Sequence, residues 1–211
     1  MNNYHDIMSY SKGFHMQNLV NQPKTKRGEA TLNRLLNAAE KLFYKKGYHG
    51  TSIHDITSAA NVAPGTFYIY FEDKMSMYQY LLLQYSRRIR QTIAKAIGEC
   101  TSRKEAERIG LRAFLEYIAK NKHVYNIIWE SLYIDKRLFV EYYTNFAKNY
   151  MHQIETAQAN QQMKEYDPEV ISFLLMGISN FIGLNYVMFK DEKNFDRVVD
   201  QVIEILEKGL F

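Results

Sequence analysis

The sequence contains few of the residues that interrupt helices. Its 211 residues include only 3 Pro and 10 Gly, and no long stretch alternates apolar and polar residues as a half-buried strand does. The single cysteine, Cys100, has no partner within the chain for a disulfide, which favours a reducing cytoplasmic location. The scarcity of Pro and Gly and the lack of long alternating stretches predict an all-α protein.

Long apolar runs are also scarce. The most hydrophobic run, residues 173–189, is interrupted by Ser179, Asn180 and Asn185. It falls short of the roughly 20 apolar residues that a membrane-spanning helix needs. The first residues lack the continuous apolar core of a secretory signal. We therefore expect no membrane partner and interpret residues 173–189 as a buried or interface helix.

The motifs of common enzyme classes are missing as well. The sequence has no phosphate-binding loop, no dinucleotide-binding glycine turn, and six His without the spacing of a metal site. Catalysis is the first rival hypothesis, and these absences argue against it. We expect no enzyme activity, no metal and no cofactor.

Charge and composition fit a soluble globular protein. The chain is 46% hydrophobic and 24% charged, with a net charge of +4. Residues 1–75 carry nine Lys and Arg against six Asp and Glu, so most of the excess lies near the N-terminus. This imbalance is a weak indication of a polyanionic partner.

Helical patterning begins at Lys26. Apolar residues then recur at intervals of three and four as far as Phe43, and Gly47 has the position of a helix C-terminus. Ser52 and Asp55 have the spacing of a capping box at the start of a second helix. Asn61 suits a positive-φ turn, and Pro64 suits the first turn of a third helix that ends near Phe71.

Two short helices joined by a tight turn form a helix-turn-helix unit. In such a unit the second helix lies in the major groove of DNA, and small residues, hydroxyls and cations face the duplex. We expect the inner face to be apolar, with Ile53, Ile56, Val62, Phe67 and Phe71. We expect Thr51, Ser52, Thr66, Tyr68, Tyr70 and Lys74 on the outer face.

Residues 25–74 resemble the DNA-binding segment of the TetR family of bacterial repressors. The shared pattern is an apolar helix ending in Lys-Gly-Tyr, then T-S-I-x-D-I, then A-x-N-V-x-x-G-T-x-Y-x-Y-F-x-x-K. Two positions depart from the family: Asn61 replaces a common turn glycine, and Ala63 replaces a common capping serine. The resemblance implies an N-terminal three-helix helix-turn-helix domain joined to a larger helical bundle for ligand binding and dimerisation.

Carried over by position, the resemblance implies two groups of DNA-contacting residues. Phosphate contacts fall on Thr51, Ser52, Tyr68, Tyr70 and Lys74. Base-facing positions are Pro64, Gly65, Thr66 and Ile69, beside the slim tip residue Ala63, with His54 reaching from the second helix. An ordinary exposed side chain is the alternative for His54, and a disordered tail is the alternative to a backbone-tracking role for Lys24, Lys26 and Arg27.

The remainder of the chain predicts further amphipathic helices. We expect them at residues 74–99, 103–120, 122–132, 135–160, 167–190 and 195–209, separated by capping residues and short turns. The expected domains are a loosely ordered arm at 1–24, a DNA-binding domain at 25–74 and an effector-binding and dimerisation domain at 75–211.

Aromatic and Met residues are abundant in the C-terminal part, where they form either a core or an apolar pocket. The resemblance implies an effector cavity there. Our candidates are Phe114, Tyr117, Trp129, Tyr142, Phe146, Phe173, Met176 and Asn180. Their character favours a small hydrophobic or aromatic effector, such as a fatty acyl compound, over a sugar phosphate.

The last two expected helices are rich in apolar residues, and the second places Phe195, Val198, Val199, Val202, Ile205, Leu206 and Leu210 in helical spacing. The resemblance implies a homodimer through these helices that binds palindromic double-stranded operator DNA. The expected function is a ligand-responsive repressor. The alternative is a helical ligand-binding or adaptor protein with a vestigial DNA-binding head.

Overall fold

The computed structural model describes residues 19–209, and every regular element within that range is helical. The elements are α2 (Lys26–Lys46), α3 (Ile53–Ala59), α4 (Gly65–Tyr70), α5 (Lys74–Ile97), α6 (Arg103–Lys120), α7 (Lys122–Ile134), α8 (Lys136–Ala159), α9 (Pro168–Gly183), η2 (Leu184–Phe189) and α10 (Asp196–Gly209). The prediction of an all-α protein is confirmed, and the expected helices lie within a few residues of those observed.

Two compact units divide the chain. The first comprises the chain up to Tyr85 together with Asn126–Tyr142, and the second comprises Ser86–Tyr125 together with the chain from Tyr143 onward. Helices α5, α7 and α8 therefore contribute residues to both units. We expected a domain boundary at residue 74 because the DNA-binding segment ends there, whereas these two units are defined by packing. The functional boundary stays a prediction.

Helix α2 begins and ends where the sequence indicates. The Thr25 hydroxyl accepts a hydrogen bond from the Gly28 N–H at 3.1 Å, which satisfies one of the free donors of the first turn. At the other end Gly47 adopts φ +73°, a conformation that favours glycine. The buried face between these ends carries Leu35, Leu36, Ala39 and Phe43 among others.

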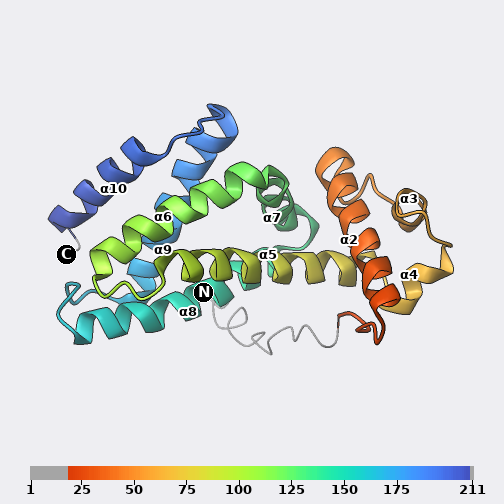
Figure 1. Cartoon of the computed structure of the whole chain (residues 1–211), viewed down its shortest axis with the longest axis horizontal. Coiled ribbons are helices and arrows are strands. Elements are labelled where there is room, and N and C mark those ends of the chain that lie inside the picture. The colour runs from red at the N-terminus through yellow and green to blue at the C-terminus, as the bar shows by residue number, and fades with distance from the viewer. Residues whose placement is uncertain (1–18, 210–211) are drawn as a thin grey trace, which may run out of the picture. The chain divides into compact units, whose positions relative to one another are not determined.

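Helices α3 and α4 pack beside α2 in the first unit (Figure 1). The capping box at the start of α3 is confirmed, because Ser52 and Asp55 bond reciprocally through side chain and backbone. Asn61 has φ +52° in the turn that follows, as its residue type predicted. Helix α4 begins at Gly65, and its N-cap residue Pro64 makes no side-chain capping bond.

The segment before α2 falls within the loosely ordered arm that we expected at residues 1–24. Residues 1–18 of that arm lie outside the described range, and among residues 19–24 only Val20 is buried. Val20 is 3% exposed, and the Asn21 N–H donates to the Tyr70 carbonyl at 2.9 Å. The backbone bond of Asn21 ties this part of the segment to α4, and the expectation of a loosely ordered arm stays a prediction.

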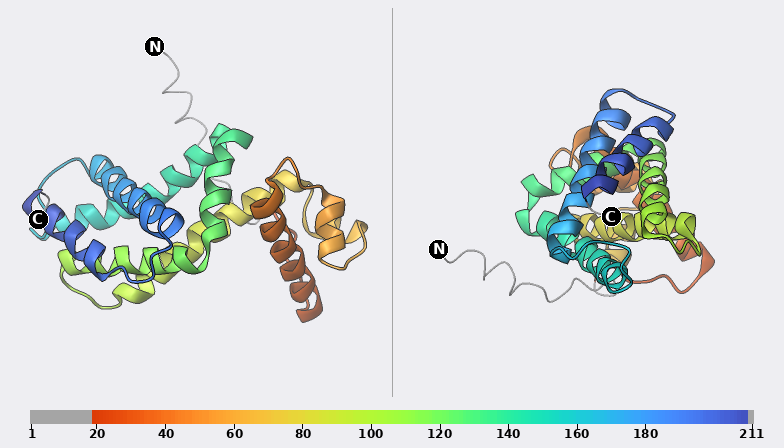
Figure 2. Two further views of the ribbon diagram at one scale, coloured as in Figure 1. Left: turned by 90° about the horizontal axis from the view of Figure 1, so that it is seen from above. Right: turned by 90° about the vertical axis from the view of Figure 1, so that its left-hand side faces the viewer.

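In the second unit α6 lies against both α9 and α10 (Figure 2). Helix α10 buries Phe195, which precedes it, and Val198, Val199, Val202, Ile203 and Leu206. Ion pairs join Lys104 and Arg108 of α6 to Glu207 and Asp200 of α10. Most of the apolar residues of the last helix that we assigned to a subunit interface are thus covered by the same chain. Leu210, the last of them, lies outside the described residues.

Helix α9 and the π-helical turn η2 form the most apolar segment. Pro168–Phe189 is long and apolar enough to cross a membrane by those two criteria alone, and 33% of its most apolar window is buried. Ile171, Leu175 and Met176 are buried, whereas Val170, Leu174 and Phe181 are exposed among others. The segment therefore has one packed face and one apolar face open to solvent.

Candidate nucleic-acid interface

The two helices of the helix-turn-helix are held together by apolar side chains and by the turn between them. Ile56 of α3 and Phe67 of α4 are fully buried, and the Val62 N–H in the turn donates to the Thr57 carbonyl at 3.0 Å. Phe71, just after α4, is also buried and lies 5.7 Å from the Phe67 ring. These contacts fix which face of α4 points outward.

The outward face of α4 carries the expected reading residues. Tyr68 is 59% and Ile69 is 60% exposed, and Pro64 and Gly65 are exposed at the N-terminal tip beside Ala63. A Cβ at Gly65 would meet no atom within 4 Å, so this tip is open. Thr66 is half-buried. A slim tip with two large side chains behind it suits a helix that enters a groove.

The start of α3 contributes Ser52 and His54, both exposed. The Ser52 hydroxyl is already engaged, accepting from the Asp55 N–H at 3.0 Å and donating to Asp55 Oδ2 at 2.7 Å. The backbone and side-chain bonds from Ser52 lower the pKa of the Asp55 carboxyl. Ser52 therefore organises the helix terminus as well as lying on its surface.

Two of the residues that we expected on the outer face are inside the unit. Thr51 is 1% exposed, and its hydroxyl donates to the Gly47 carbonyl at 2.8 Å. Tyr70 is 7% exposed, and its hydroxyl donates to the Gly28 carbonyl at 3.2 Å. The expectation that these two hydroxyls face outward is wrong, because both complete bonds between neighbouring segments.

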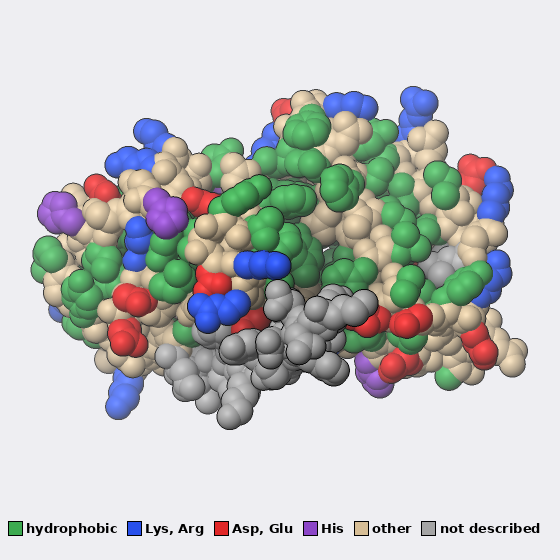
Figure 3. Space-filling view, turned by 180° about the vertical axis from the view of Figure 1, so that it is seen from behind, with side chains coloured by type: hydrophobic (Ala, Val, Ile, Leu, Met, Phe, Trp, Pro, Cys, Tyr) green, Lys and Arg blue, Asp and Glu red, His purple; other side chains and the backbone are tan. Residues whose placement is uncertain are grey.

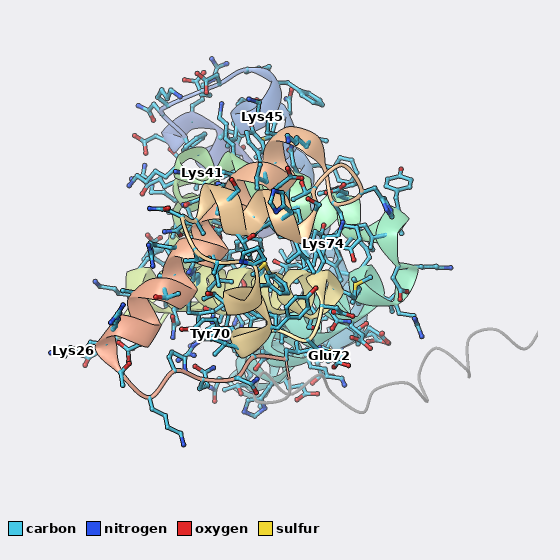
Figure 4. The ribbon with its side chains drawn as sticks, turned by 90° about the vertical axis from the view of Figure 1, so that its right-hand side faces the viewer. Lys26, Lys41, Lys45, Tyr70, Glu72 and Lys74 are labelled. Atoms are coloured by element: carbon cyan, nitrogen blue, oxygen red, sulfur yellow. The ribbon has the colours of Figure 1, made fainter. Side chains whose placement is uncertain are left out.

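Lys74 is half-buried and bonded within its own unit. Its ammonium group donates to the carbonyls of Tyr48 and Thr51, each at 2.6 Å, and lies 4.1 Å from the centre of the Tyr48 ring. Figure 4 shows Lys26 extending outward from the start of α2, whereas Lys74 lies among the side chains of the unit. Desolvation by burial lowers the pKa of Lys74, and the charge of Glu130 opposes that shift.

Sequence reasoning missed the partners of Lys74. Glu130 of α7 accepts a hydrogen bond from the Tyr48 N–H at 2.7 Å, and a Cβ at Gly47 would lie 2.7 Å from its Oε1. The Tyr48 ring also packs edge-on against Tyr78. Glu130 is 82 residues from Tyr48 in the chain, so no local pattern could reveal the contact.

Helices α3 and α4 contain no Lys or Arg, and exposed cations lie in and just before α2. Lys24, Lys26, Arg27, Lys41 and Lys45 are exposed in and just before α2. On the face shown in Figure 3, Lys and Arg side chains are spread among hydrophobic and neutral ones. Such a distribution can contact phosphates at several points along a duplex.

The structure distributes the expected effector residues over both units. Trp129 and Tyr142 belong to the first unit, and the others belong to the second. Met176 and Tyr142 are buried; Phe114, Tyr117, Trp129, Phe146 and Asn180 are half-buried; and Phe173 is exposed on α9. Phe173 and Met176 therefore cannot line one interior site together, since one faces solvent and the other faces the core.

Asn180 lies in a polar cluster inside the second unit. The backbone carbonyl of Asn180 accepts a hydrogen bond from the Tyr125 hydroxyl, and its side-chain Oδ1 accepts one from the Tyr143 hydroxyl at 3.3 Å. Burial raises the pKa of Tyr143 to about 12 and also raises that of Tyr125. Both hydroxyls thus remain protonated donors near neutral pH. Within residues 19–209, no group of His, Cys, Asp and Glu is arranged to hold a metal ion.

Comparison with known proteins gives one consistent family. Residues 35–81 match the sequence model described as bacterial regulatory proteins, tetR family. The transcriptional activator FasR of Mycolicibacterium smegmatis is 26% identical over 101 residues, which are 48% of this chain and 46% of that protein. The regulator UidR of Escherichia coli K12 is 36% identical over 56 residues, 26% of this chain and 29% of its own. These matches thus span less than half of either curated relative.

Solved structures resemble the chain over more of its length. The fatty acid degradation regulator FadR from Bacillus halodurans has a TM-score of 0.74 at 19% identity, covering 88% of this chain and 96% of its own. Salmonella enterica GusR has a TM-score of 0.72 at 18% identity, covering 89% of this chain and all of its own. At these identities the likeness shows the fold.

Replacing Lys74 with Met tests whether the lysine is structural. Lys74→Met keeps the aliphatic stem but leaves two carbonyls without their donor. We expect the free energy of unfolding to fall by about 2 kcal/mol, since hydrogen bonds to a charged group contribute roughly 1.5–3 kcal/mol. Urea unfolding followed by circular dichroism measures this change.

Lys46→Met at an exposed position of α2 is the matched control, and we expect little change in its unfolding. Equal stability of the Lys74 and Lys46 variants would show that the ammonium group contributes nothing to the fold.

Proposed function

The chain belongs to the TetR family of bacterial regulatory proteins, and on that premise we propose that it is a ligand-responsive repressor of transcription. It is a DNA-binding transcriptional regulator of the helix-turn-helix type. In the proposal it binds palindromic operator DNA as a homodimer in the cytoplasm and leaves the DNA when a small apolar effector binds. The proposal assigns it no catalytic role.

The observation that carries the proposal is the outer surface of α4. Tyr68 and Ile69 are largely exposed while Phe67 between α4 and its neighbours is fully buried. Two adjacent large exposed side chains behind an uncrowded glycine tip, Gly65, form a surface that a partner can cover. A major groove is the partner that fits a helix of this size.

We propose that base-facing contacts come from Pro64, Gly65, Thr66 and Ile69, and phosphate contacts from Tyr68. Apolar side chains such as Ile69 can meet a thymine methyl but cannot make the bidentate bonds that identify a base. Ser52, His54 and Ala63 flank these residues on the same surface. Thr51, Tyr70 and Lys74 support the surface from inside through the hydrogen bonds of their side chains.

The homodimer is proposed to form through the last two helices, with α9 contributing most of the apolar surface. Val170, Leu174 and Phe181 recur along α9 at helical spacing and are at least half exposed. Ile205 adds an exposed apolar side chain from α10. A two-fold dimer carries two reading helices related by symmetry, which suits a palindromic operator.

The effector is proposed to be a small apolar or aromatic compound, with a long-chain fatty acid as the first candidate. The support is the aromatic and apolar character of Phe114, Tyr117, Phe146 and Met176 in the second unit. Two neighbours in fold are titled a fatty acid degradation regulator and a putative fatty acid metabolism regulator. Bundles commonly hold such ligands between helices.

Release is proposed to follow from a coupling free energy between the effector site and the DNA site. An effector that prefers one spacing of the two reading helices weakens operator binding, and DNA weakens effector binding by the same factor. Helix α5 carries residues of both units and is therefore the proposed lever.

The DNA-binding proposal is tested by selecting bound sequences from random duplexes and measuring affinity against salt. We expect enrichment of a palindrome and a loss of affinity of about 10³-fold or more between 50 and 200 mM salt if six or more phosphates are contacted. Tyr68→Ala should weaken operator binding by about tenfold, with Tyr44→Ala, another exposed tyrosine, as the control. The adaptor alternative predicts no enrichment and no effect of Tyr68→Ala.

The dimer proposal is tested by placing a charge on the exposed face of α9. Phe181→Glu should convert the dimer to a 24.9 kDa monomer in sedimentation equilibrium, because a carboxylate buried in an apolar seam is costly. Tyr133→Glu, at an exposed aromatic position of α7, should leave the dimer intact. If Phe181→Glu remains dimeric, the seam lies elsewhere.

The effector proposal is tested by titrating palmitate, below its micelle concentration, into a complex of the protein with its selected operator. We expect operator affinity to fall five- to 150-fold, the usual range for coupling between two sites. A glucuronide is the polar control and should change nothing. Unchanged affinity at saturating palmitate would exclude a fatty acid as the effector.

A further inference from the structure

The segment that precedes α2 is bonded to the end of the reading helix. The Asn21 N–H donates to the Tyr70 carbonyl at 2.9 Å, and the Asn21 side-chain amide donates to the Ile69 carbonyl at 3.0 Å. One residue therefore supplies donors to the last two carbonyls of α4. It lies 48 residues before Ile69 in the chain.

These carbonyls are groups that a helix cannot satisfy by itself. The last four carbonyls of an α-helix have no partner within it. Helix α4 has only six residues and no side-chain cap at Pro64, so both of its ends depend on outside contacts. Helices this short are unstable in isolation, and the orientation of α4 must come from its neighbours.

One further bond reaches the same end of α4. Val20 is buried beside Asn21, and the Tyr70 hydroxyl donates to the Gly28 carbonyl in the first turns of α2. A Cβ at Gly28 would lie 2.9 Å from Pro23 Cβ and 3.6 Å from the Tyr70 hydroxyl, so these segments approach closely. Residues 20–28 thus form a clasp around the C-terminal end of α4.

The clasp acts on the residue that faces the groove in our proposal. The Ile69 carbonyl is held by Asn21 while its side chain is 60% exposed. A displacement of that carbonyl would move the side chain with it, and Tyr68 beside it. A shift of this kind changes base contacts without removing any charge from the surface.

We propose that Asn21 is a positioning residue for DNA recognition, which sets the orientation of α4 by bonding its last two carbonyls. The inference rests on the proposed DNA-binding function. A direct bond from Asn21 to a phosphate is the competing role for an exposed amide. The two roles differ in their salt dependence, because positioning loses no phosphate contact.

The experiment compares the unaltered protein with Asn21→Ala and Asn21→Leu, both of which lack the side-chain donor. Asn37→Ala, an exposed asparagine of α2, is the matched control. Affinity is measured for the selected operator and for a scrambled duplex at several salt concentrations. Hydrogen exchange of the α4 amides is measured without DNA.

We expect both Asn21 variants to bind the operator about tenfold more weakly, with unchanged affinity for the scrambled duplex and an unchanged salt slope. The α4 amides should exchange faster than in the unaltered protein, and Asn37→Ala should behave like the unaltered protein. Undiminished operator affinity would overturn the inference, as would an equal loss on both duplexes with a smaller slope.

A failure of the proposed DNA-binding function gives a different result from a failure of this inference. If the unaltered protein enriches no duplex, the DNA-binding proposal fails by itself. Hydrogen exchange then decides the structural part of the inference, and equal protection of the α4 amides in Asn21→Ala and in the unaltered protein would overturn it.

Discussion

The bond of one ammonium group to two backbone carbonyls fixes the loop from which the reading helices start. Lys74 donates to Tyr48 and Thr51 at the two ends of the loop between α2 and α3, and Glu130 accepts the Tyr48 N–H. A cation at the start of a helix is unfavourable for the helix dipole, and burial adds a desolvation cost. The carbonyls, the aromatic ring of Tyr48 and the Glu130 charge offset both. The loop, and with it Ser52 at the start of α3, is thereby held.

In the helix-turn-helix, some side chains hold neighbouring segments together and others are exposed for contact with a partner. Thr51 and Tyr70 use their hydroxyls to join neighbouring segments, whereas Tyr68 and Ile69 have exposed side chains. Residues that a DNA-binding pattern brings together in sequence thus divide between two physical roles. A hydroxyl that is buried and bonded stabilises the surface, and only an exposed one can bind a phosphate directly.

Local features of the fold could be predicted from the sequence, and long-range ones could not. The capping box at Ser52, the positive φ of Asn61 and the end of α2 at Gly47 depend on residues within one turn of each other. The bonds of Glu130 and Asn21 join residues 82 and 48 positions apart, and neither residue type has a pattern that announces such a contact. The predicted exposure of Tyr70 was wrong for the same reason, since the sequence of a short helix does not reveal which neighbouring segments cover each position.

Helices α9 and α10 both carry an apolar face, but the structure covers these two faces differently. The apolar face of α10 packs on α6, and ion pairs such as Arg108–Asp200 join the two helices. Helix α9 packs one face on α6 and leaves Leu174 and Phe181 exposed in the described chain. A helix that is apolar nearly all round needs two covering surfaces. Since α6 provides one, the proposed second subunit is the natural source of the other, and α9 rather than α10 sets the area of that contact.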